Sequence, residues 1–336
     1  MWKDHPWFGV GPAHYDDCFP AYRPAEIQAR PGYAHNDYLQ TLAEWGLVGT
    51  GLIAASWALL FVGIIKTWRL VSRESDGLGP KLGNRAAFVY GAAIGLSAIL
   101  IHSFVDFNMH IPANAILAIT LMALLTGYQR FCTERYWIRL GWTGRLLFTS
   151  IILTALAFIS QQGWRRAGES TCLERAANER TYSQTMIAAL KRAYEIEPTN
   201  FETTYALGEA LRQLSWQGYA GYEKLAQEAI EWFRRGIHLN PYDPYNYMKI
   251  GMCLDWLEQH TEAARFFDEA VKRDPNNYYV LAHQGWHFVQ AKNYQAAKGW
   301  FDRSIKIRWW DNPIAYSYLS IVEQKLKETQ DSRRNQ

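Results

Sequence analysis

The stretch Leu47–Ile65, which reads LVGTGLIAASWALLFVGII, decides the fold of the first half of this 336-residue chain. It contains no charged side chain, and its length is close to the ~20 residues with which a helix crosses a bilayer. Three further apolar segments follow, at residues 86–105, 111–128 and 146–160. The sequence therefore predicts an all-α protein in which about four membrane helices occupy residues 47–164.

The bulk composition excludes several classes of function. Mean hydropathy is only −0.25, because the apolar residues are concentrated before about residue 165 and the remainder is rich in charge. The formal net charge of +3 provides no field that would recruit nucleic acid. The 4 cysteines are scattered and form no CxxC pair, so the sequence predicts neither a disulfide framework nor a zinc site.

The loops between the apolar segments predict how the chain is oriented in the membrane. The loops at residues 66–85 and 130–145 carry several lysines and arginines, whereas the loop at residues 106–110 carries none. Positively charged loops stay on the cytoplasmic side of a membrane. Residues 1–46, the 106–110 loop and everything after residue 165 are therefore expected on the outer side.

After residue 165 the sequence repeats with a period of 34 residues. Pro241 and Pro275 are separated by this interval, and so are Gly251 and Gly285. Small residues at fixed places let paired helices pack closely, and a proline ends the second helix of each pair. This pattern resembles that of the tetratricopeptide repeat family, which forms a helical solenoid.

The resemblance implies four repeats and a capping helix over residues 165–336. They are predicted at 167–200, 201–243, 244–277 and 278–311, with the cap at 313–327 and an insertion near 214–222. Such arrays bind peptides or partner domains on a concave face, so a protein partner is expected. The alternative is an array that only stacks on the membrane domain.

A polar segment with a histidine, Ala34–Gln40, lies a few residues before the first apolar stretch. Imidazole is the side chain that titrates nearest neutral pH, so His35 is a candidate proton acceptor at the membrane surface. Arg23 and Arg30 lie nearby in the sequence. A base and guanidiniums suit a reaction in which a hydroxyl attacks and a phosphorylated group leaves. The alternative is a histidine that only hydrogen-bonds the start of a helix.

The outer loop repeats this chemistry, because His102, Asp106 and His110 are spaced by four residues. If a helix continues through Asp106, His102 and Asp106 share one face. A metal site is one interpretation; the other is that these residues bind each other and position the loop. The sequence has no phosphate loop, GxGxxG, GxSxG, HExxH or metal-binding DxD motif, so neither a cofactor nor a catalytic metal is expected.

Three ordered blocks carry a second resemblance: His5–Pro12, Ala34–Gln40 with Glu44–Gly49, and His102–Ala115. Together they are similar to the O-antigen ligase/polymerase family of bacterial inner-membrane proteins, over about residues 1–130. Members that end in tetratricopeptide repeats are a familiar arrangement in that family.

This resemblance implies a metal-independent glycosyltransferase of cell-envelope polysaccharide and lipopolysaccharide biosynthesis. Its members take a glycan from an undecaprenyl-pyrophosphate carrier and move it to a lipid, a growing glycan or a protein, without a cofactor. His35 matches the proposed catalytic base. The candidate contacts to the pyrophosphate or the acceptor are Arg23, Arg30, Asn36, Asp37, Tyr38, His102 and Asp106.

The resemblance also implies a multi-pass protein of the bacterial inner membrane, with residues 1–46 and the repeats in the periplasm. Family members have more membrane spans than this chain, so the chain is expected to be a C-terminal portion. Three alternatives stay open: a polymerase, a non-catalytic membrane-anchored scaffold for glycan assembly, and a transporter subunit.

Overall fold

A computed structural model describes residues 1–71, 84–132 and 140–334, and the regular secondary structure of these residues is entirely helical. The predicted all-α fold class is confirmed for them. The chain divides into two compact units. The first contains Met1–Cys18 and Pro31–Leu146, and the second contains Phe19–Arg30 and Leu147–Gln336.

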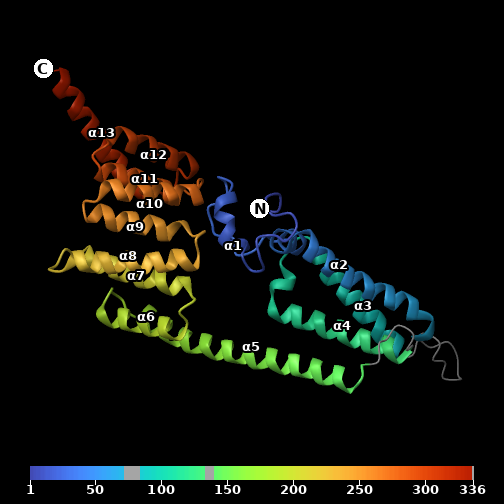
Figure 1. Ribbon diagram of the computed structural model, residues 1–336. Helices are drawn as coiled ribbons and strands as arrows, with labels where there is room; N and C mark the ends of the chain where they lie inside the picture. Colours follow the sequence, from blue (N-terminus) through green and yellow to red (C-terminus); the bar gives the residue numbers. More distant parts are fainter. Residues whose placement is uncertain (72–83, 133–139, 335–336) are drawn as a thin grey trace. The chain divides into compact units, whose positions relative to one another are not determined.

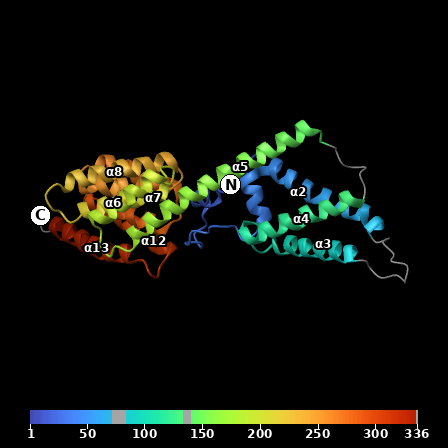
Figure 2. The same ribbon diagram turned by 90° about the horizontal axis from the view of Figure 1, so that it is seen from below.

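The first unit is built on three helices that lie side by side (Figure 1 and Figure 2), α2 (Asp37–Val71), α3 (Asn84–His102) and α4 (Pro112–Cys132). Their shared core is aliphatic and buries Leu60, Leu96 and Leu125. Two short elements accompany them, α1 (Tyr15–Cys18) and the 3-10 turn η2 (Asn108–His110). Most apolar side chains of these helices face outward, as expected for helices in lipid.

Among the described residues, three helices are long and apolar enough to cross a membrane: Asp37–Trp68, Pro112–Phe131 and Trp142–Ala177. The predicted second span corresponds to a shorter apolar helix, Ala86–His102. The first helix begins at Asp37 rather than Leu47, so the segment with His35 leads directly into it. Much of the two basic loops used to predict orientation, including Arg73, Lys81, Arg135 and Arg139, lies outside the described residues.

Helix α5 (Trp142–Ala177) is a single helix that begins with an apolar span and ends in the repeats. Its C-terminal part buries Glu169, whose Oε1 accepts hydrogen bonds from Asn200 Nδ2 at 2.7 Å and Thr203 Oγ1 at 2.9 Å. The predicted domain boundary near residue 164 therefore falls inside a continuous helix.

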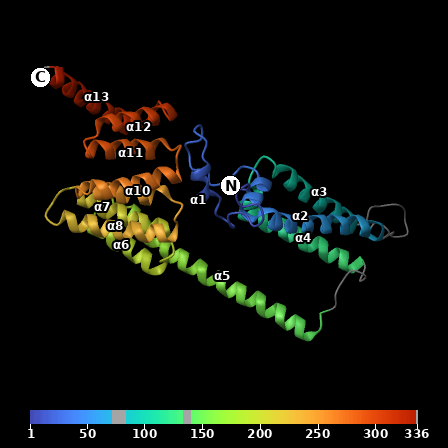
Figure 3. The ribbon, with the colours of Figure 1, turned by 45° about the horizontal axis from the view of Figure 1, so that its top comes forward.

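The rest of the second unit is a stack of antiparallel helices, seen in Figure 1 and again in Figure 3. In chain order they are α6 (Gln184–Ile196), α7 (Phe201–Ser215), α8 (Tyr222–Leu239), α9 (Pro244–Trp256), α10 (His260–Arg273), α11 (Tyr278–Gln290), α12 (Tyr294–Ile307) and α13 (Pro313–Arg334). The 3-10 turn η1 (Phe19–Tyr22) also belongs to this unit.

A glycine and a phenylalanine fix the packing of three helix pairs, α7 with α8, α9 with α10 and α11 with α12. A Cβ added to Gly251 would lie 2.6 Å from the ring of Phe267, and one added to Gly285 would lie 2.7 Å from the ring of Phe301. Both glycines and both rings are 34 residues apart. The same contact joins Gly208 to Phe233. The period in the sequence is therefore the spacing of one close helix–helix contact.

Candidate functional site

The frame of the candidate site is a break in helix α2 at Gly46, where φ is 62° and ψ is −167°. The N-terminal segment supplies hydrogen bonds at this break. The N–H groups of Val10 and Gly11 donate to the carbonyls of Ala43 and Glu44 at 2.9 and 3.0 Å. Beyond the break, the N–H groups of Leu47 and Val48 donate to Pro6 and Trp7 at 2.9 and 3.1 Å. The first sequence block is thus bonded to the second.

Glu44 extends this frame toward His35. Its Oε2 accepts the backbone N–H of Ala13 at 3.0 Å, and its Oε1 accepts Gln40 Nε2 at 3.1 Å. Gln40 Oε1 in turn accepts the N–H of Ala34 at 3.0 Å. Because Gln40 and Glu44 are only 2% and 3% exposed, these bonds fix the backbone next to His35.

Asp37 joins the second block to the third. Its Oδ2 accepts Ser103 Oγ at 2.7 Å and the backbone N–H of Met109 at 3.0 Å, while His110 Nδ1 donates to its Oδ1 at 2.8 Å. A buried carboxylate that accepts three hydrogen bonds is well satisfied. Asp37 therefore holds the 103–110 loop against the start of α2.

The residues on either side of Asp37 make further bonds to the same loop. Asn36 Nδ2 donates to the carbonyl of Phe104 at 2.8 Å, and its Oδ1 accepts the N–H of Leu39 at 2.9 Å. Tyr38 donates its hydroxyl to the carbonyl of Leu100 at 2.6 Å. Asn36, Asp37 and Tyr38 were predicted as substrate contacts, and in this structure their side chains hold the frame together.

His35 itself stands at the surface of this frame. Its φ is 49°, in the left-handed region that non-glycine residues rarely adopt, and its side chain is 69% exposed. Its Nδ1 lies 3.7 Å from Asp106 Oδ1, and its ring meets Phe107 edge-on at a centroid distance of 4.9 Å. Tyr33 stacks on the same ring of Phe107, at a centroid distance of 4.6 Å. The structure thus brings His35 and Asp106 together.

The predicted relationship between His102 and Asp106 is different in the structure. Helix α3 ends at His102, so Asp106 lies beyond the helix and the two side chains do not share a helical face. His102 Nδ1 instead accepts a hydrogen bond from Asn108 Nδ2. No group of three histidine, cysteine, aspartate or glutamate side chains within the described ranges could hold a metal ion.

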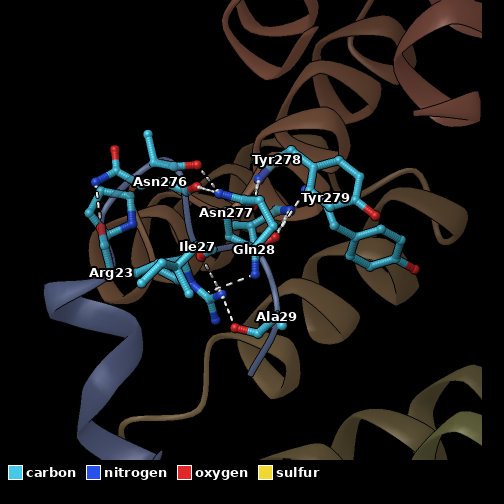
Figure 4. A network of polar contacts seen from close by, with 12 residues as sticks. Arg23, Ile27, Gln28, Ala29, Asn276, Asn277, Tyr278 and Tyr279 are labelled. Atoms are coloured by element: carbon cyan, nitrogen blue, oxygen red, sulfur yellow. Dashed lines mark hydrogen bonds and ion pairs between the residues drawn. The ribbon is translucent and has the colours of Figure 1, made fainter. Parts of the chain in front are cut away.

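Arg23 and Arg30 belong to the second unit. Arg23 is only 3% exposed, and its Nε donates to Asp274 at 3.0 and 3.2 Å. Figure 4 shows Arg23 near Asn276, in the turn before α11, and Tyr278, the first residue of α11. Arg30 is about half exposed, with its Nη1 3.6 Å from Glu202 Oε1.

Sequence reasoning gave no role to Gln40, Glu44 and Ser103, and it grouped His110 with His102 and Asp106 rather than with Asp37. These four residues hold the backbone on both sides of His35. All four lie within the sequence blocks that carry the family resemblance. Their positions within the motifs marked these residues as candidates. The chemical role of each one depends on contacts that the spacing of the motifs does not reveal.

Two family models match parts of the chain. Residues 1–54 match a model described as O-antigen ligase, and residues 257–313 match one described as tetratricopeptide repeat. Both resemblances are confirmed over these residues. The third block, His102–Ala115, lies outside the residues matched by the O-antigen ligase model. No curated protein sequence matches the chain significantly.

Solved structures of repeat proteins are similar to parts of the chain at low sequence identity. The crystal structure of MamA protein is 16% identical over 48% of this chain and 88% of that one, with a TM-score of 0.36. A MamA structure from Desulfovibrio magneticus RS-1 is 14% identical over 52% and 97%, with a TM-score of 0.36. YrrB, described as a TPR protein with an unusual peptide-binding site, is 14% identical over 77% and 96%, with a TM-score of 0.34.

The family matches and the geometry together describe a chain with two kinds of module. It combines an O-antigen ligase-like segment, which bears His35, with tetratricopeptide repeats, a module that mediates protein–protein interaction.

Proposed function

We propose that the protein is an O-antigen ligase-like glycosyltransferase whose base is His35. The observation that carries this proposal is the exposed imidazole of His35 beside Asp106, on a frame built from all three sequence blocks. A base must be reachable by the substrate and fixed by its surroundings. His35 meets both requirements.

The proposed reaction uses His35 together with Asp106. A carboxylate near Nδ1 favours the tautomer with its proton on that nitrogen, which leaves Nε2 as the basic atom. Nε2 takes the proton of an acceptor hydroxyl, and the oxygen attacks the anomeric carbon of the glycan. The bond from that carbon to the pyrophosphate breaks, and undecaprenyl pyrophosphate leaves with the bonding electrons. Asp106 stabilises the imidazolium that forms.

The proposal places this reaction at the periplasmic face of the bacterial inner membrane. It is supported by the charge of the loops, because basic loops favour the cytoplasmic side and the segment with His35 is then expected on the other side. The acceptor is a lipid, a glycan or a protein. The contacts of Arg23 and Arg30 with the pyrophosphate stay predictions, since both residues belong to the other unit.

Replacement of His35 by alanine tests the base. In cells that lack the gene and are complemented with it, His35→Ala should lower glycan transfer by about 10²- to 10⁴-fold, the usual contribution of a positioned base. Membrane insertion should be unchanged. The matched control is His238→Ala, which removes an exposed histidine of α8. Normal transfer by His35→Ala would move the function to the repeats and favour a non-catalytic scaffold.

A further inference from the structure

The segment Phe19–Arg30 packs as part of the repeat unit, although the residues on both sides of it belong to the first unit. Met1–Cys18 and Pro31–Leu146 make up the first unit, which contains α2, α3 and α4. A loop of the O-antigen ligase-like segment is thus held by the repeats, within the second unit. Figure 4 shows this loop, which we call the docked loop, against the turn between α10 and α11.

Arg23 is the centre of the docked loop. Its Nε donates to both oxygens of Asp274, and its Nη1 donates to the carbonyls of Ile27 and Ala29 at 3.1 and 2.9 Å. The guanidinium therefore closes the loop on itself and attaches it to the repeats. Arg23 is 3% exposed and Asp274 is fully buried.

Gln28 and Asn276 form a second attachment. Gln28 Nε2 donates to the carbonyl of Asn276 at 2.9 Å, and the N–H of Tyr278 donates to Gln28 Oε1 at 3.2 Å. Asn276 Nδ2 donates to the carbonyl of Arg23 at 2.7 Å. These bonds use the backbone of both segments, so they specify one register of the loop on the turn.

The negative charge of Asp274 occurs at this position in one repeat and not in the repeats next to it. The residues 34 positions before and after Asp274 are Asn240 and Arg308, so neither neighbouring turn has a carboxylate at the equivalent position. Asn277 Nδ2 donates to Asp274 at 2.9 Å and holds that carboxylate in place. Burial raises the pKa of Asp274, and its hydrogen bond from Asn277 and the charge of Arg23 oppose this rise. The turn is therefore built to receive a cation.

The docked loop leads directly into the candidate base. His35 follows Arg30 by five residues, a length of chain that spans at most ~18 Å. Fixing residues 19–30 therefore restricts where the backbone of His35 can lie. We infer that the repeats act on the reaction within the same chain, and that Arg23 and Gln28 are positioning residues that hold the loop leading to His35. This inference rests on the proposed function.

The inference differs from the prediction that Arg23 contacts the pyrophosphate. A phosphate contact depends on Arg23 alone, because Asp274 would play no part in it. A positioning role depends equally on both partners of the buried pair. Variants on the two sides of the contact therefore separate the two roles.

The experiment compares Arg23→Met, Asp274→Asn and the double variant of the complete chain in detergent, with undecaprenyl-pyrophosphate-linked glycan as the donor. Each single variant should lower kcat by about 10- to 100-fold, the effect of a small misplacement of a reacting group. The KM for the donor should not change. The double variant should be no slower than the slower single variant.

Hydrogen exchange provides a readout that does not depend on catalysis. In each variant, exchange should rise in residues 19–30 and in the turn around Tyr278, but not in α7 or α8. The matched control is Glu195→Gln, which breaks an exposed ion pair with Arg192 on the same unit. It should change neither exchange in the loop nor transfer.

Several results would overturn the inference. A raised KM in Arg23→Met with normal kinetics in Asp274→Asn would assign Arg23 to the pyrophosphate, and normal kcat in both would show that docking has no effect. If Asp274→Asn also raises hydrogen exchange in α7 and α8, the kcat of Gln28→Ala replaces it as the test of the positioning role, because this variant removes only contacts made by the docked loop. Failure of the proposed function gives a different result. In that case His35→Ala would transfer glycan normally, while the variants of Arg23 and Asp274 would still raise hydrogen exchange in the docked loop.

Discussion

Gly46 lies directly against the backbone of Trp7. A Cβ added to Gly46 would be 2.4 Å from the carbonyl carbon of Trp7, closer than any real contact. Two residues later, the N–H of Val48 donates to the carbonyl of Trp7. The break in α2 and the N-terminal segment are therefore one structural element, and only glycine fits at their crossing.

Replacement of Gly46 by alanine should disrupt this crossing. The residue has a positive φ, which costs a non-glycine residue about 1–3 kcal/mol, and the clash with Trp7 adds to that. We expect a lower melting temperature of the purified protein in detergent and a loss of glycan transfer. Gly51→Ala is the control, because a Cβ on Gly51 meets no atom within 4 Å. Equal stability of the two variants would contradict this account.

Replacement of Asp37 by alanine should separate the 103–110 loop from the start of α2. Three donors, on Ser103, Met109 and His110, would lose their acceptor. Leaving a buried donor unsatisfied costs about 1–3 kcal/mol. Transfer should fall by at least about 10-fold because Asp106 would no longer be held near His35. Asp302→Ala, which removes an exposed carboxylate of α12, should leave transfer unchanged.

Two glycines of the repeats should respond in opposite ways to alanine. Gly285→Ala places a Cβ against the ring of Phe301, and overpacking of this kind costs about 1–3 kcal/mol. Gly299→Ala meets nothing within 4 Å and lies inside α12, so it should stabilise by about 0.5–1 kcal/mol. Unfolding in denaturant, followed by tryptophan fluorescence, measures both. A stabilising Gly285→Ala would show that this contact is loose.

Stability of the repeat unit should fall as the pH drops from about 6.5 to about 4. Burial lowers the pKa of His283 to about 4, against an ordinary value of 6.5. The folded state therefore binds fewer protons than the unfolded state in this window, so stability is fully present above it and is lost below it. The pKa of Glu209 is about 2, because Arg212 and Lys249 outweigh the effect of burial, so Glu209 stays ionised throughout.

His283→Asn isolates this contribution. The amide keeps a donor for the carbonyl of Tyr279, to which His283 Nδ1 donates at 2.8 Å, but it does not titrate. Denaturant midpoints at pH 7.5 and pH 4.5 should differ less for the variant than for the unchanged protein. An identical pH dependence in the two proteins would show that His283 does not contribute to it.

The fold class was predictable because its signals are local and repeated. Gly251 and Gly285 mark the same helix contact at a fixed interval, and the apolar stretch from Leu47 is long without interruption. The frame of the candidate site was harder to predict from the sequence. Glu44 and Asp37 were visible as motif residues, but whether a carboxylate contacts substrate or backbone depends on which N–H groups the fold brings to it.

The pair of Arg23 and Asp274 could not be predicted from the sequence. The two residues are separated by 251 positions, and opposite charges occur throughout the chain. Only the burial of both side chains distinguishes this pair from the exposed ones. The start of the first membrane helix at Asp37 was missed for a related reason, because its first turns are polar and are held by hydrogen bonds rather than by apolar burial.

The continuity of α5 has a consequence for the angular setting of the repeats. Because one helix carries both the apolar span and the buried Glu169, each residue along it advances the chain by about 1.5 Å and turns it by about 100°. One extra residue after Gly163 would rotate the repeats by about 100° relative to the apolar span. Seven extra residues would restore the original orientation to within about 20°. Chain length between span and repeats is thus constrained in whole turns, a periodic restriction that no flexible linker would impose.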